Sequence, residues 1–493
     1  MSNTWTDIFL LACVCMYGLG LLFVSLYSIS QAQLLWRYLH KRKPEEVYLR
    51  DETLRPQVTI QLPVYNEQYV AERLIDAVCR IRYPQELLEI QVLDDSTDET
   101  TAIIAEKAAA WKARGANIVH LRRPNREGFK AGALKHGLAT AQGGFIAIFD
   151  ADFVPGEDFL EKTLPYFADP QTGMVQTRWG HINRNYSMLT RLQAFALDAH
   201  FTVEQVGRNM GGFINFNGTA GIWRKTAILD AGNWEADTLT EDLDLSYRAQ
   251  LKHWKFVYLE DVVSPAELPP VMSALKSQQY RWTKGGAEVA RKHIGNVIRS
   301  RFSFGEKWHG AFHLLNSAIF VSVFITSITS VPLLYAKQHF PGLNALFLAA
   351  TLFLLSFVVL GGLYYVSSRN YFNAQGQGVW YFLFSFPVFL SMSMGLSLHN
   401  AVAVMEGYVG RKTPFVRTPK FNINTAADGW AGNVYVRNAF TPLVIAEALL
   451  MLYFIYGIVT GIRLGDFGLL PFHAMLAAGF GAVFFYSVSQ KRG

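Results

Sequence analysis

The chain has 493 residues, of which 51% are hydrophobic and 14% aromatic, and its formal net charge is +6. Its three cysteines provide neither a disulfide framework nor the ligand spacing of a metal site, and we expect them to be packing residues. Acidic and basic residues are interspersed between positions 37 and 300, which argues against nucleic-acid binding, and basic residues beside apolar runs account for the net charge.

The first apolar run, residues 8–29, is close to the roughly 20 residues that a helix needs to cross a bilayer. A cleaved signal peptide would have a basic n-region and a small-residue cleavage site, and this run has neither. We therefore predict a retained transmembrane anchor over 1–36. The basic cluster from Trp36 to Lys43 predicts, by the positive-inside rule, that the next domain is cytoplasmic.

Residues 37–300 contain no comparable apolar run and are predicted to form one cytoplasmic domain. Short β-rich runs alternate there with helical stretches at about 67–82, 98–114 and 130–141. The β-rich runs are 58–62, 90–93, 117–121 and 144–149. This alternation predicts an α/β fold with a parallel sheet covered by helices on both faces. In such sheets ligands bind beyond the carboxyl ends of the strands.

Polar residues follow the first two strands. Tyr65 and Glu67 come after the first strand, and Asp94 and Asp95 after the second. Asp, Ser and Thr at a strand-to-helix junction are also ordinary N-caps. Both roles can hold together, with Ser96 or Asp98 capping the helix and Asp94 or Asp95 facing a ligand.

The next two strand ends suggest phosphate and metal chemistry. Lys130 lies at the start of a helix, where it and free backbone N–H groups could neutralise a diphosphate, although a lone lysine is usually solvated. Asp150 and Asp152 directly follow a buried strand, and two carboxylates there need a cation or strong donors. Mg²⁺ or Mn²⁺ bridging a diphosphate would fit, and capping of the following turn is the alternative.

Two later motifs could complete a site. In Thr240-Glu241-Asp242 a carboxylate could act as general base, and the alternative, a capping box, lacks its Glu because Leu243 stands there. Gln278, Arg281 and Trp282 share one helix face. They could offer a cation to a leaving diphosphate and a flat platform to a sugar ring, or form a surface packing pair.

Residues 301–493 are predicted to form an all-α membrane bundle. Further apolar runs lie there at 311–335, 343–366, 378–400, 438–461 and 467–488. Basic residues flank the first three of these runs: Arg299, Arg301, Arg411, Lys412, Arg417, Lys420 and Arg437. An even number of crossings must lie between two cytoplasmic basic flanks. We therefore predict that 378–400, which holds Pro387, is interfacial or re-entrant.

In their order, these motifs resemble the D, DxD, TED and QxxRW signatures of the inverting, processive glycosyltransferase family 2 enzymes, the cellulose, hyaluronan and mannan synthases. The stretches around 93–98, 126–134, 216–224 and 278–282 resemble especially the cellulose synthase-like A and C groups of plants. These groups make β-1,4-mannan or glucomannan and the β-1,4-glucan backbone of xyloglucan. The resemblance implies a GT-A type nucleotide-sugar-binding domain.

The resemblance also implies roles for individual residues. Asp152 would ligate Mg²⁺ or Mn²⁺, and Asp242 would be the general base. The remaining residues would bind substrate: Tyr65, Glu67, Asp94 or Asp95, Lys130, Asp150, Glu241, Gln278, Arg281, Trp282, Phe415, Thr418 and Lys420.

The segment 411–420 contains a stretch, Phe415 to Lys420, that resembles the FxVTxK gating loop of cellulose synthase. It departs from that pattern by Arg417 in place of Val and by a Pro before Lys420. A second departure is Asn217, which stands where the family has Cys in its FFCG-type stretch.

The expected function is polymerisation of a β-linked, and by resemblance β-1,4-linked, polysaccharide from UDP-glucose or GDP-mannose, with translocation across the membrane. The partners would be the nucleotide sugar, the growing polysaccharide and the lipid bilayer, without nucleic acid. The protein would be a multi-pass protein of a bacterial inner membrane or its equivalent. The alternatives are a nonprocessive transferase acting on a membrane lipid and a transporter or receptor with a regulatory nucleotide-binding domain. The sequence does not choose the donor sugar or the oligomeric state.

Overall fold

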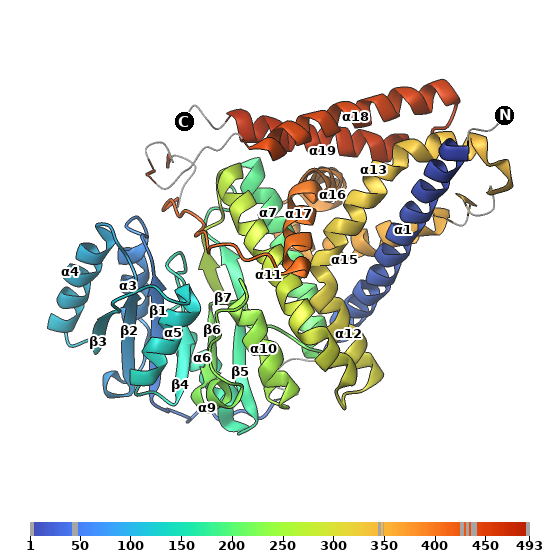
Figure 1. The fold of residues 1–493 in the computed structure, drawn as a ribbon. Coiled ribbons are helices and arrows are strands. Elements are labelled where there is room, and N and C mark those ends of the chain that lie inside the picture. Colours follow the sequence, from blue (N-terminus) through green and yellow to red (C-terminus); the bar gives the residue numbers. More distant parts are fainter. Residues whose placement is uncertain are drawn as a thin grey trace.

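A computed structural model describes residues 4–41, 48–343, 347–348, 350–423, 428–429, 433–434 and 441–489. Within them, a sheet covered by helices lies beside a group of long helices (Figure 1). All strands fall between α1 (Thr4–Leu39) and α11 (Met272–Arg299), in the range predicted for the cytoplasmic domain. The basic cluster predicted after α1 extends partly outside the described residues, because 42–47 are not among them.

The described residues form one sheet in the strand order β3-β2-β1-β4-β6-β5-β7. The strands are β1 (Val58–Val64), β2 (Leu88–Asp94), β3 (Ile118–Arg122), β4 (Phe145–Ile148), β5 (Thr172–His181), β6 (Gly221–Arg224) and β7 (Lys255–Ala266). The first four are parallel to one another, as predicted. The three later strands were not predicted. Among them, β6 runs antiparallel to β4 and β5, and helices lie between β5 and β6 in the chain.

Two apolar layers sandwich the sheet because its strands alternate their side chains between the faces. On β4, Phe145 and Ala147 join the core under α3 (Ala71–Cys79), α4 (Thr100–Ala113) and α6 (Phe159–Thr163). Ile146 and Ile148 join the core of the other face, under α5 (Phe129–Thr140), α9 (Lys225–Asp230) and α10 (Glu241–Leu251). The predicted covering of both faces by helices is confirmed.

The long helices pack beside the sheet, with α1 along α13 and α18 along α19 (Figure 1). Their bounds are α7 (Met188–Ala199), α8 (Gln205–Asn209), α12 (Phe304–Leu314), α13 (Ala318–His339), α15 (Leu354–Ala374), α16 (Gly378–Gly395), α17 (Ser397–Val409), α18 (Pro442–Leu464) and α19 (Leu470–Ser489). Glycines allow close approach: a Cβ on Gly395 of α16 would lie 2.3 Å from the carbonyl oxygen of Gly479 in α19.

Among the described residues, five helical segments are long and apolar enough to cross a membrane: Thr4–Leu39, Phe304–His339, Gly378–Gly395, Pro442–Leu464 and Leu470–Ser489. The run predicted at 343–366 lies partly outside the described residues, and α15 in its later part is not one of the five. Gly378–Gly395 is one of the five, and its length and composition do not decide between a crossing and the predicted interfacial placement, which stays a prediction. Arg437, one of the basic residues behind that prediction, lies outside the described residues.

Candidate active site

The carboxyl ends of β1, β2 and β4 open onto two adjoining cavities. The first is lined by residues that include Tyr65, Glu67, Asp95, Arg126, Lys130, Asp150, Asp152, Arg281, Phe415, Thr418 and Lys420. The second is lined by residues that include Asp150, Asp152, Trp179, His181, Asn217, Glu241, Asp242, Gln278, Arg281, Trp282 and Lys420. The structure therefore brings the predicted residues together from distant parts of the chain, with one exception, Asp94.

Asp150 and Asp152 lie just beyond β4 and differ in their partners. Asp150 accepts a hydrogen bond from the Lys130 ammonium at 2.5 Å, and its backbone N–H donates to Thr219 Oγ1. Asp152 is 4% exposed, and its Oδ2 lies 2.7 Å from the ammonium of Lys420. Its Oδ1 is buried and has no hydrogen-bond partner among the described residues. Asp152 thus retains an oxygen that can accept a cation.

A divalent cation would fit beside Asp152. A buried carboxylate oxygen without a donor is costly, and Mg²⁺ and Mn²⁺ prefer such oxygen ligands together with phosphate oxygens. Glu67 lies in the same field: burial raises its pKa to about 6 against the opposing charges of Arg417 and Lys420, while Asp152 and Asp150 add to the rise. The site thus concentrates negative charge that a cation would relieve.

Asp94 and Asp95 at the end of β2 have separate roles. Asp94 is 1% exposed, accepts from the backbone N–H of Ser96 at 2.8 Å, and lies 2.9 Å from His120 Nε2. Burial would raise its pKa, but the His120 and Ser96 hydrogen bonds outweigh burial and lower it. Asp95 lies in the cavity wall, where Arg123 donates two hydrogen bonds to it at 2.7 and 2.6 Å. Of the two open candidates, Asp95 faces the ligand space.

Lys130 lies where the chain turns sharply into α5. Gly128 has φ +67° and Phe129 has φ +49°, a left-handed turn that aims the first residues of the helix at β4. The Lys130 ammonium donates to Asp150 and, at 2.9 Å, to the carbonyl oxygen of Gly218. Burial disfavours its charge, but the carboxylates of Asp150 and Glu241 outweigh burial and raise its pKa. Lys130 is therefore a fixed cation and not a solvated surface lysine.

Asp242 lies in the first turn of α10. Its Oδ1 accepts a hydrogen bond from the backbone N–H of Leu243 at 2.8 Å. Burial and the neighbouring Glu241 raise the pKa of Asp242 to about 7, against the opposing charge of Lys130. A carboxylate with a pKa near neutrality is suited to act as a general base. The capping alternative fails, because the Thr240 side chain makes no capping hydrogen bond and its Oγ1 has no partner among the described residues.

Two glycines let the chain approach this motif closely. A Cβ on Gly218, which has φ +81°, would lie 3.0 Å from Asp242 Oδ2. A Cβ on Gly285 of α11 would lie 2.5 Å from Thr240 Cγ2. The first approach brings backbone to the candidate base, and the second packs α11 directly on the loop before α10.

Gln278, Arg281 and Trp282 of α11 line the second cavity together, as their shared helix face predicts. Gln278 is 9% exposed, and Trp282 lies 6.3 Å from Trp179, centroid to centroid. The Arg281 guanidinium lies 5.0 Å from the centre of the Phe415 ring. Arg281 and Trp282 line a cavity, so the alternative that they form a packing pair on the surface is not supported.

The segment 411–420 crosses the first cavity. Phe415 stacks on Phe129 at 5.6 Å, Arg417 donates to Glu67 Oε1 at 3.2 Å, and Lys420 pairs with Asp152. Thr418 is buried, and its Oγ1 has no partner among the described residues. This segment therefore contacts residues that follow the ends of β1 and β4.

The charged residues of the site that were not predicted include Arg126 and Glu267. The Arg126 guanidinium lies 3.3 Å above the centre of the Tyr65 ring and also faces Phe129 and Phe415. Glu267 at the end of β7 is 4% exposed and accepts hydrogen bonds from the backbone N–H groups of Phe421 and Asn422 at 2.9 Å. Arg126 is the first residue of the motif that contains Lys130, so the sequence offered a signal that could have identified it. Glu267 belongs to no motif, and the sequence offered no such signal.

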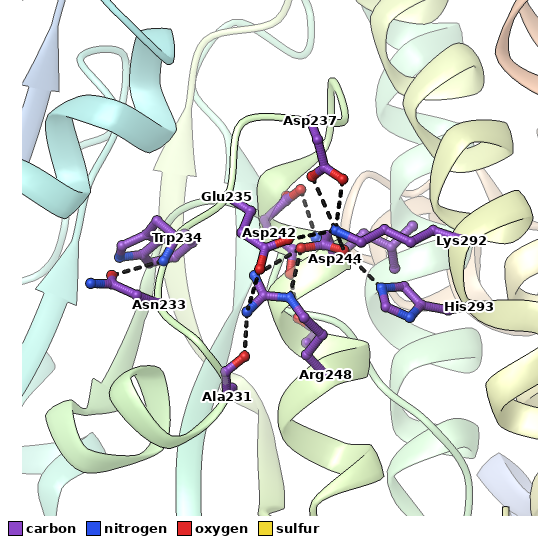
Figure 2. Close-up of polar contacts among 12 residues, drawn as sticks. Ala231, Asn233, Trp234, Glu235, Asp237, Asp242, Asp244, Arg248, Lys292 and His293 are labelled. Atoms are coloured by element: carbon purple, nitrogen blue, oxygen red, sulfur yellow. Dashed lines mark hydrogen bonds and ion pairs between the residues drawn. The ribbon is translucent and has the colours of Figure 1, made fainter. Parts of the chain in front are cut away.

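A separate group of carboxylates could in principle hold a metal ion: Glu235, Asp237 and Asp244. Figure 2 shows that they surround the ammonium of Lys292, at 2.7, 2.9 and 2.8 Å respectively. Burial would raise the pKa of Asp244, but the hydrogen bond with His293 and the charges of Arg248 and Lys292 outweigh burial and lower it to about 2. We therefore interpret this cluster as an ion-pair network that joins α10 to α11.

Comparisons with known proteins relate part of the chain to one family. Residues 56–285 match the family described as Glycosyltransferase like family 2. The chain is 41% identical over 323 residues to Glucomannan 4-beta-mannosyltransferase 7 of Arabidopsis thaliana, an alignment that covers 62% of this chain and 58% of that relative. It is 35% identical over 353 residues to Probable glucomannan 4-beta-mannosyltransferase 15 of the same plant, covering 67% and 66%.

Among solved structures, mannosyltransferase PcManGT from Pyrobaculum calidifontis in complex with GDP-Man and Mn²⁺ aligns with 74% of this chain and 97% of its own, at 19% identity and a TM-score of 0.49. The chain spans somewhat more than half of the length of the first curated relative.

Proposed function

Because residues 56–285 form a domain of glycosyltransferase family 2, we propose that the chain is an inverting membrane glycosyltransferase that builds a β-1,4-linked, mannose-containing polysaccharide. The names of the relatives support mannosyl transfer, which favours GDP-mannose over UDP-glucose as the first donor to test. The observation that carries the proposal is the placement of Asp242, Lys130 and Arg281 around one cavity.

In the proposed reaction, Asp242 takes the proton of an acceptor hydroxyl, and the hydroxyl oxygen attacks the anomeric carbon of the donor sugar. The bond from that carbon to the diphosphate oxygen breaks, and the diphosphate leaves with the electron pair. A single displacement converts an α-linked donor into a β-linked product. Lys130 and Arg281 hold the diphosphate and stabilise its developing charge.

Asp152 would hold the divalent cation, Mg²⁺ or Mn²⁺, with its unpartnered Oδ1 and with the oxygen that now contacts Lys420. When bound, the cation would neutralise charge on the diphosphate. The remaining site residues would bind the donor and keep water out of the site. Arg126 and Tyr65 form one wall, and Phe415 covers them.

We also infer a membrane location with the sheet domain in the cytoplasm. The five apolar helical segments support a multi-pass protein. Release of the product across the bilayer is part of the proposal, and it is supported by the packing of α11, which carries Trp282, against α12, α17 and α19.

The test is incorporation of labelled sugar by the full-length chain in lipid nanodiscs with Mg²⁺ or Mn²⁺, comparing GDP-mannose and UDP-glucose. The expected result is a high-molecular-weight β-1,4-linked product from GDP-mannose, digestible by a β-mannanase. One or two sugars that stay with the lipid fraction would contradict polymerisation and favour a lipid acceptor. No incorporation from either donor would overturn the proposal.

A further inference from the structure

The end of β5 extends beyond its neighbour β6. β5 pairs with β6 only from Met174 to Gln176, whereas its pairing with β7 continues to His181. A register irregularity between Thr177 and Arg178 re-aims the side chains that follow. The residues after it are half-buried, although the strand before it is buried. The strand end therefore forms part of the wall of the second cavity.

Trp179 and His181 are the two residues of this strand end that line the cavity, together with Asp242 and Trp282. Residues two apart on a strand point to the same side, so both side chains belong to one wall. The indole of Trp179 is fixed by Phe201, which stacks on it at 4.8 Å, and by Phe153, whose edge meets it at 5.2 Å.

Each of these two side chains carries a nitrogen that has no hydrogen-bond partner among the described residues: Trp179 Nε1 and His181 Nε2. The His181 side chain is 1% exposed, and the nearest carboxylate oxygen, Asp198 Oδ1, is 3.5 Å from Nε2, too far for a good hydrogen bond. Asp198 is already held by Arg184 through two contacts of 2.7 Å. Among the described residues, Trp179 Nε1 therefore has no acceptor, and His181 Nε2 has only the long contact with Asp198.

Leaving a buried donor without an acceptor costs about 1–3 kcal/mol, and such groups in a native cavity call for an explanation. A sugar chain supplies what is missing, since its hydroxyl oxygens accept hydrogen bonds and its ring faces pack on aromatic side chains. The indoles of Trp179 and Trp282 lie 6.3 Å apart, so a sugar on Trp282 would be next to the β5 wall.

We propose that Trp179 and His181 form an acceptor subsite that binds hydroxyls of the sugar behind the one that reacts. This inference rests on the proposed function. Two residues along a strand cover about 7 Å, comparable to the length of one hexose unit. An acceptor whose terminal sugar meets Asp242 and Trp282 would then place its second sugar against β5. The subsite would make the enzyme prefer oligosaccharide acceptors over a single sugar.

The test uses the full-length chain in nanodiscs with GDP-mannose and soluble acceptors: mannose, β-1,4-mannobiose and β-1,4-mannotriose. The variants are Trp179→Phe, which keeps the packing but removes the indole N–H, and His181→Phe. For each variant we expect the KM for mannobiose and mannotriose to rise about tenfold, the effect of one lost hydrogen bond of about 1.4 kcal/mol. The KM for mannose should rise much less than that of either oligosaccharide, because a single sugar has no second unit to place against β5.

Trp223→Phe is the matched control, because its Nε1 is also buried without a partner but its side chain, 0% exposed, lies in the sheet core and not in the cavity wall. The inference is overturned if Trp179→Phe and His181→Phe leave the ratio of the mannose and mannobiose KM values at the wild-type level. Failure of the wild type to extend any acceptor would count against the proposed function instead.

Discussion

The carboxyl group of Asp242 gains and loses its proton near neutral pH. Burial and Glu241 raise its pKa to about 7, so below that pH the carboxyl is mostly protonated and cannot take a proton. We therefore predict that transfer rises with pH through about 7 and then levels off. The measurement is the pH dependence of kcat/KM for the acceptor, and an acid limb centred near pH 4 would contradict it.

A substitution of Asp242 can distinguish a role in the reaction from a role in donor binding. Asp242→Asn keeps the shape but removes the base, and we expect turnover to fall by roughly 10²–10⁴-fold. Donor binding, measured by calorimetry with GDP-mannose, should stay within a few-fold of the wild type. Asp244→Asn, two residues further along α10, is the comparison, because its carboxylate pairs with Lys292 and His293 away from the cavity. Equal turnover for wild type and Asp242→Asn would remove Asp242 from the mechanism.

Sequence reasoning succeeded for residues whose position follows from strand ends and motifs. Asp150, Asp152 and Lys130 follow strands, and the carboxyl ends of parallel strands share one edge of the sheet. It could not separate Asp94 from Asp95, because the difference depends on His120, a residue of the neighbouring strand β3 that lies 26 positions away from Asp94. Trp179 and His181 were missed because an unpartnered nitrogen is visible only in the folded chain.

At the scale of elements, the segment 411–420 brings a lysine into the place where a metal ion would bind. The ammonium of Lys420 lies 2.7 Å from Asp152 Oδ2 and would compete with a divalent cation for that oxygen. We predict that Lys420→Met raises the affinity for Mn²⁺ several-fold in the absence of donor. Electron paramagnetic resonance of free Mn²⁺ measures this directly.

Lys412→Met is the control for that experiment, because Lys412 belongs to the same segment but donates to the carbonyl oxygen of Asp237. Its Mn²⁺ affinity should equal that of the wild type. If Lys420→Met binds Mn²⁺ no better than Lys412→Met, the ammonium does not compete for the metal position.

The ion-pair network between α10 and α11 makes a prediction about stability. Lys292→Met leaves Glu235, Asp237 and Asp244 facing one another without the ammonium among them. We expect a loss of about 1–3 kcal/mol in the free energy of unfolding, seen as a lower Tm of the purified protein. Lys252→Met, which breaks an exposed pair with Asp230, should cost less than about 1 kcal/mol. Equal Tm values for the two variants would show that the network does not stabilise the fold.

At the scale of the whole molecule, the side of the membrane on which residue 411 lies decides the topology. Basic residues predict that it lies in the cytoplasm with the sheet domain. In a background without Cys13, Cys15 and Cys79, a cysteine introduced by Arg411→Cys should react with an impermeant thiol reagent only from the cytoplasmic side. Lys112→Cys, on the exposed surface of α4, marks the side on which the sheet domain lies. Opposite labelling of the two cysteines would require an odd number of crossings between the sheet domain and residue 411.

The apolar runs predicted where the helices of the bundle lie. They did not predict which of these helices cross the membrane. Runs 438–461 and 467–488 correspond closely to α18 and α19, because a long uncharged run has few alternatives to a helix. Run 378–400 divides into α16 and α17 near Leu396, and α1 extends well beyond 8–29 at both ends. These limits depend on packing between helices, which hydropathy does not record.

The contact of Gly285 with Thr240 has a mechanical consequence. A Cβ added at position 285 would lie only 2.5 Å from Thr240 Cγ2, so α11 packs tightly against the loop that leads to Asp242. A tilt or slide of α11 against the bundle would therefore displace Asp242, the base of the proposed reaction, with it. In the proposed reaction Trp282 of α11 holds the acceptor and Asp242 is the base. A shift of α11 that advances the product would therefore also move the base.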